Sequence, residues 1–105
     1  MHDPATNDEK RLIRGEFIVE GNLENREYLS ILTQTANRLN LKGYIKRLGA
    51  NKYILVIEGC KANIEIFAKQ VVRNTVPDSL KITGIKTTDV IFKPYRGDLP
   101  PFRML

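Results

Sequence analysis

Few side chains in this chain of 105 residues could support covalent or acid–base chemistry. It contains one histidine, His2, and one cysteine, Cys60, and the histidine lies in a polar stretch at the start of the sequence. A Ser-His or Cys-His site in the folded part would therefore lack its base. One cysteine and one histidine are also too few for a zinc site of the usual type. The sequence predicts no metal site and shows no P-loop or Gly-x-Gly-x-x-Gly motif.

The chain has more basic than acidic side chains. Lysine and arginine number 17 against 12 aspartate and glutamate residues, which gives a formal net charge of +5. Such a balance favours anionic partners such as phosphates, nucleic acid or an acidic protein. The basic residues are spread along the chain, so no basic tail for nucleic acid is indicated.

The first strand and the first helix are predicted from hydrophobic spacing. Apolar residues become strand-like from Leu12 and end at the turn signal Glu20-Gly21-Asn22. A helix is expected to start near Asn25 or Glu24, where a short polar side chain can accept hydrogen bonds from the first free amides. Its apolar stripe recurs at intervals of three or four residues and consists of Leu29, Leu32, Ala36 and Leu39.

The middle of the chain predicts a hairpin and a second helix. Strands at residues 43–48 and 52–58 are separated by the turn signal Gly49-Ala50-Asn51, so they should pair antiparallel. The second strand is nearly all apolar, which predicts a central, buried position. The helix that follows should end before Pro77, and its core-facing stripe consists of Ile64, Phe67, Ala68, Val71 and Val72.

The remaining strands complete a βαββαβ order. Leu80, Ile82 and Ile85 should begin a fourth strand, residues 90–92 should extend it or add another, and residues 102–105 should form a short edge strand. This order predicts a ferredoxin-like α+β sandwich, an antiparallel sheet of four to five strands with two helices on one face. We expect one domain at residues 12–105 after a flexible arm at residues 1–11.

Three segments together resemble the acylphosphatase family. Gly43-Tyr44-Ile45-Lys46-Arg47, a turn and the strand ending at Glu58-Gly59 are similar to the family's Gly-aromatic-Val-x-Asn, turn, strand and glycine. The preceding stretch from Ala36 to Gly43 is similar to its Ala-x-x-Leu-Gly-Leu-x-Gly. Phe102-Arg103-Met104-Leu105 resembles its closing Phe-x-Ile strand, so the resemblance covers Arg14 to Leu105.

The resemblance implies hydrolysis of a carboxyl-phosphate bond without metal or organic cofactor. In the family, backbone amides of the loop after the first strand cradle the phosphate at a helix start, and an arginine at the loop's end clamps it. Val19-Glu20-Gly21 is similar to the family's Val-Gln-Gly, which makes Arg26 the candidate clamp. The candidate phosphate-binding residues are Gly21, Asn22, Leu23, Glu24 and Asn25.

Two features of the candidate site depart from the family. Arg47 stands where the family has the asparagine that positions the attacking water, and an arginine carries no acceptor for that purpose. We expect Arg47 to contact the anion instead. Glu20 and Glu24 place negative charge beside the loop, which disfavours an anion.

The sequence therefore supports an acylphosphatase-like hydrolase with atypical catalytic residues, Arg26 and Arg47. The alternative is a catalytically inactive module of this fold that binds a phosphate-bearing, protein or nucleic-acid partner.

A nucleic-acid module is the third hypothesis, because the RRM shares the βαββαβ order. Its central strand needs two alternating aromatic residues to stack bases, and residues 52–57 offer one, Tyr53. Nucleic acid is therefore the least favoured partner, behind a small acyl phosphate or another anion.

The sequence also bears on where the protein is located and whether it assembles. No apolar run approaches the roughly 20 residues of a membrane span, and no secretion signal is visible. A lone cysteine fits a reducing compartment. We expect a cytoplasmic monomer that does not bind membranes.

Overall fold

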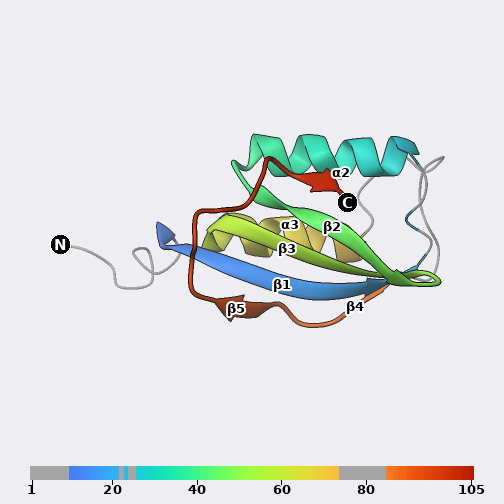
Figure 1. The fold of residues 1–105 in the computed structure, drawn as a ribbon. Coiled ribbons are helices and arrows are strands. Elements are labelled where there is room, and N and C mark those ends of the chain that lie inside the picture. Colours follow the sequence, from blue (N-terminus) through green and yellow to red (C-terminus); the bar gives the residue numbers. More distant parts are fainter. Residues whose placement is uncertain (1–9, 22, 24–25, 74–84) are drawn as a thin grey trace.

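The computed structural model describes residues 10–21, 23, 26–73 and 85–105, and the elements follow in the predicted order. The proposed arm lies outside these residues, apart from Lys10 and Arg11. The strands and helices (Figure 1) are β1 (Leu12–Glu20), α2 (Arg26–Arg38), β2 (Lys42–Gly49), β3 (Lys52–Cys60), α3 (Lys61–Arg73), β4 (Lys86–Thr87), β5 (Ile91–Lys93) and β6 (Arg103–Met104). No helix in this described part of the chain is long and apolar enough to cross a membrane.

The sheet has the order β4-β1-β3-β2-β6, with β5 also paired to β1. β3 runs antiparallel to both β1 and β2, so the most apolar strand is central, as its composition predicts. The ferredoxin-like prediction is confirmed. The sheet has six strands and is mixed, because the closing strand β6 runs parallel to β2.

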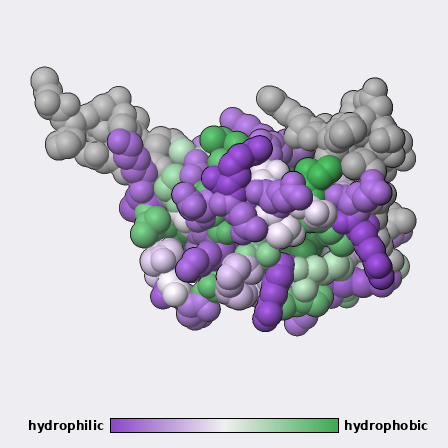
Figure 2. Space-filling view, turned by 90° about the horizontal axis from the view of Figure 1, so that it is seen from above, coloured by the Kyte–Doolittle hydropathy of each residue, from purple (hydrophilic) through white to green (hydrophobic). Residues whose placement is uncertain are grey.

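Alternate residues of the strands and one stripe of each helix form a single core. Every second residue of β1 from Ile13 to Val19 is buried. α2 contributes Tyr28, Leu32 and Ala36, and α3 contributes Ile64, Phe67 and Val71. Burying each large apolar side chain contributes roughly 1.5–3 kcal/mol. Seen from above, the surface is mostly hydrophilic, with small separate hydrophobic areas (Figure 2).

The fourth strand of the fold is split in two. Most of the strand predicted at residues 80–85 lies outside the described residues, and β4 begins just after Ile85. Thr88 separates β4 from β5 while bonding to β1: its amide donates to the Ile18 carbonyl at 2.9 Å, and its hydroxyl accepts the Ile18 amide at 2.9 Å. The hydroxyl thus replaces a backbone carbonyl in the ladder and lets the chain step away from β1.

A strap, residues 94–102, crosses from β5 to the far edge of the sheet over the face opposite the helices (Figure 1). The buried carboxylate of Glu58 on β3 accepts the amides of Arg96 and Gly97 at 2.8 and 3.0 Å. Arg14 Nε lies 3.5 Å from the same carboxylate. At the end of the strap, Phe102 is buried with its ring edge-on to Phe67, with 5.5 Å between the ring centroids.

Candidate functional site

The predicted site residues lie where β1 ends and α2 begins. β1 ends at Glu20 and α2 begins at Arg26, at the same end of the molecule as the turn between β2 and β3 (Figure 1). Of the predicted phosphate-binding residues, Asn22, Glu24 and Asn25 lie outside the described residues. Gly21 and Leu23, and the two arginines, can be placed.

Gly21 joins the loop to the β2–β3 turn. Its amide donates to the Asn51 carbonyl at 2.8 Å, and its φ of 152° is one that glycine adopts readily. A hydrogen engaged in this bond is not available to a phosphate. In this conformation the Gly21 amide connects the loop to the turn, and the expectation that it supplies a cradle amide stays a prediction.

Leu23 anchors the middle of the same loop. Its side chain is fully buried and belongs to the hydrophobic core. Any role of Leu23 in binding an anion is thus restricted to its backbone. The side chain thus packs in the core at a point in the sequence between Glu20 and Arg26.

Arg26 is the first residue of α2 and is exposed. The first amides of a helix have no intrahelical acceptor, and the helix dipole is positive there, so this position favours anions. Glu27, the next residue, adds a carboxylate in the first turn. The helix start therefore offers one cation and the positive end of the helix dipole, partly offset by one acidic side chain.

Arg47 lies near the end of β2 on the helix-facing side of the sheet. It pairs with Tyr53, which is buried in the core, and shares its side of the strand with buried Ile45. Its Nε donates to the Gly49 carbonyl at 3.2 Å, and its side chain is exposed. The fold thus brings Arg26 and Arg47 to the same end and the same side of the sheet.

Glu20 has a lysine opposite it on each of the two neighbouring strands, and the sequence around Glu20 does not predict either of them. It pairs in register with Lys52 on β3 and with Lys86 on β4. All three line a surface hollow of about 420 Å³ with Gly21, Ala50 and Asn51. Two lysines on the strands that flank Glu20 offset the negative charge expected to repel an anion. The sequence did not predict Lys86 at this place, because its position depends on the pairing of strands that are far apart in the sequence.

Tyr28 is the third residue of α2 and is buried. Desolvation by burial raises the pKa of its hydroxyl to about 12. The hydroxyl therefore stays protonated at neutral pH and cannot act as a base there.

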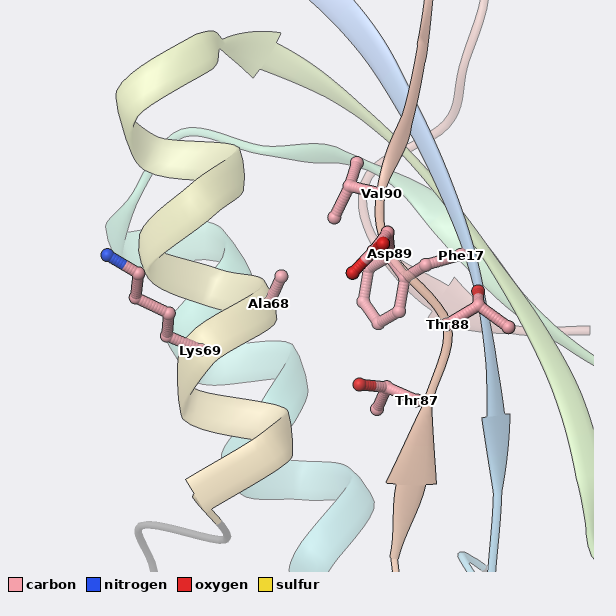
Figure 3. Close-up of a pocket in the computed structure, with 7 residues that line it drawn as sticks. All are labelled: Phe17, Ala68, Lys69, Thr87, Thr88, Asp89 and Val90. Atoms are coloured by element: carbon pink, nitrogen blue, oxygen red, sulfur yellow. The ribbon is translucent and has the colours of Figure 1, made fainter.

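A second cleft, of about 200 Å³, separates α3 from the β4–β5 segment (Figure 3). Phe17 and Ala68 face each other across it, whereas the Lys69 ammonium points away. Asp89 is the acidic residue in its lining. The cleft brings together no catalytic set, and the described residues contain no cluster of three potential metal-binding side chains.

Tyr53 cannot provide the base-stacking surface that the RRM hypothesis requires. This ring is fully buried on the helix side of the sheet. The residues of β3 on the opposite face are aliphatic at Ile54 and Val56, which cannot stack on bases as aromatic rings do.

Comparisons with known proteins agree with the fold. A family model described as acylphosphatase matches residues 15–103. The acylphosphatase from Bacillus subtilis superposes with a TM-score of 0.66 at 19% identity, covering 89% of this chain and 98% of that one. Full-length HypF in its phosphate- and nucleotide-bound form gives 0.64 at 19% identity, over 90% of this chain but 12% of that one.

The same scaffold also occurs in a protein that is not described as an acylphosphatase. The BLUF protein BlrB gives a TM-score of 0.60 at 15% identity, covering 92% of this chain and 74% of that one. None of the curated proteins compared with the chain matches it. Structural likeness at these identities speaks for the fold alone, whereas the family model spans most of the sequence.

Proposed function

Because this chain belongs to the acylphosphatase family, we propose that it binds the phosphate group of an acyl phosphate where β1 meets α2, and that it hydrolyses the bond slowly. The observation that carries the proposal is the pair of arginines, Arg26 and Arg47, at one end and on one side of the sheet. Both guanidinium groups are exposed there.

Binding of the phosphate rests on positive charge and on hydrogen-bond donors. Arg26 at the start of α2 can clamp two phosphate oxygens, and the first amides of the helix supply further donors. Arg47 adds a second guanidinium from β2. Lys52 and Lys86 reduce the repulsion from Glu20.

Slow hydrolysis follows from what Arg47 lacks. Phosphoryl transfer depends on positioning the nucleophile and on neutralising charge. Arg47 can neutralise charge, but it has only donors and cannot accept a hydrogen bond from the attacking water. Asn51 carries a carboxamide, but it lies in the β2–β3 turn beyond the end of β2, and its backbone carbonyl ties that turn to Gly21.

The proposed binding is tested with inorganic phosphate and benzoyl phosphate. Loss of a charge-assisted hydrogen bond costs roughly 1.5–3 kcal/mol, so Arg26→Ala should weaken phosphate binding about tenfold or more, as measured by titration calorimetry or amide NMR shifts. Arg38→Ala, in the last turn of the same helix, is the matched control and should leave binding unchanged. Equal affinities of the wild type and Arg26→Ala would remove Arg26 from the site.

A further inference from the structure

One face of the sheet carries no helix. α2 and α3 cover the face that bears Phe17, Val19 and Leu55, all of which are buried. The strap crosses the opposite face where Glu58 holds it. Away from the strap, no other described strand or helix packs on that face.

The uncovered part of this face is apolar at its centre. Ile18 and Ile54 are direct partners across β1 and β3 and are half-buried. Ile91 on β5 is 62% exposed. With Glu16, Phe17, Thr88 and Lys93, these three isoleucines line a shallow trough of about 240 Å³. We call the three isoleucines and Lys46 the open-face patch.

The charges around the open-face patch have a positive excess. Glu16 is neutralised by Lys93, whose ammonium lies 2.6 Å from its carboxylate. Glu20 stands between Lys52 and Lys86. Lys46 is in register with Ile54 and exposed, and no ion pair involving it occurs among the described residues. Arg103, beside Tyr44 on the edge strand, adds a further cation.

We propose that the open-face patch docks an acidic, amphipathic segment of a partner protein, with apolar side chains in the trough and carboxylates on the surrounding lysines. A second copy of this chain would bring two positive faces together, which is repulsive. Single-stranded nucleic acid would need aromatic platforms, and the trough offers isoleucines where those would be. The face is opposite the one that bears Arg47, so this inference does not depend on the arginine pair; it shares only Lys52 and Lys86 with the proposed function.

The proposal predicts which variants lose binding. The probe is a short acetylated peptide of alternating leucine and glutamate, titrated into the isotope-labelled full chain and followed by amide NMR. The largest shifts should fall on Ile18, Ile54 and Ile91, and Lys46→Glu should weaken binding about tenfold. Ile91→Ser, at an exposed position that should not disturb folding, should weaken it similarly. The matched control is Lys69→Glu, the same charge reversal at an exposed position on α3. This variant should bind the peptide as the wild type does.

Three results would overturn the proposal. The first is no binding of the acidic peptide by the wild type. The second is equal or tighter binding of a matched leucine–lysine peptide or of single-stranded oligouridine. The third is that Lys46→Glu and Lys69→Glu weaken binding alike, because that would indicate a general charge effect and not docking at this face.

Discussion

At the scale of single residues, the exchange of an asparagine for Arg47 is the feature that most changes what the site can do. An asparagine offers both a donor and an acceptor, whereas an arginine offers donors alone and a permanent positive charge. The fold leaves the position unchanged: Arg47 lies on β2 in register with Tyr53. Under the proposed function, Arg47 would therefore favour holding an anion over activating water.

Gly43 is a residue whose identity the backbone dictates. Its φ is 149°, and a Cβ there would collide with the carbonyl of Val56 on β3. The clash is with backbone, so no side-chain rearrangement can relieve it.

Gly43→Ala should therefore destabilise the protein by about 3 kcal/mol, the sum of backbone strain and overpacking. The measurement is urea unfolding followed by circular dichroism. Gly49→Ala is the control, because a Cβ at Gly49 meets open space and its cost should be small. Equal stability of the two variants would show that β2 can move away from β3 at Gly43.

Motif positions in the sequence predicted two of the residues proposed for the site. Arg26 and Arg47 were identified from motif positions, and the fold places both at one end of the sheet. The bond of the Gly21 amide to the Asn51 carbonyl was not predicted, because it depends on how the hairpin turn meets the loop. The lysines beside Glu20 come from strands that are distant in sequence, and local spacing holds no signal for them.

At the scale of elements, the strap explains how the closing strand reaches its place. The amides of Arg96 and Gly97 converge on one carboxylate of Glu58, in a backbone turn where Gly97 has a φ of 75°. Successive amides in such a turn form a concave anion-binding nest. Further along, the Pro100 carbonyl accepts the Gly43 amide at 2.9 Å, which sets β6 beside β2.

Removing the carboxylate should therefore loosen the strap. Glu58→Ala leaves Arg14 and two strap amides without their acceptor, which should cost about 3 kcal/mol or more in unfolding free energy. Amide hydrogen exchange at Arg96 and Gly97 should accelerate more than exchange within β3. Glu65→Ala on α3 is the control variant. Unchanged exchange in the strap would show that Phe102 alone holds it.

The pattern of elements was easier to predict than their ends. Periodicity placed both helices, because their apolar stripes recur every three to four residues and face one core. The hairpin followed from its turn, where Asn51 has a φ of 53°. The split of the last strand at Thr88 was not predictable, because a side-chain hydroxyl takes a place in the ladder that only the folded pairing reveals.

At the scale of the whole molecule, the two faces of the sheet suit different tasks. One face carries the helices, the core and the arginine pair, and the other carries the strap and the open-face patch. The same scaffold in acylphosphatases, HypF and a BLUF protein shows that architecture by itself does not determine chemistry. The function of this chain must therefore be judged from its own site residues.

The central claim is that this site binds an acyl phosphate but activates water poorly because of Arg47. The most direct measurement is the kcat for benzoyl phosphate in the wild type, Arg47→Asn and the neighbouring control Lys46→Asn. Restoring a hydrogen-bond acceptor that can orient the attacking water should raise kcat about tenfold or more, because positioning the nucleophile is a main part of catalysis in phosphoryl transfer, while Lys46→Asn leaves it unchanged. Fast hydrolysis by the wild type that falls in Arg47→Asn would contradict the account.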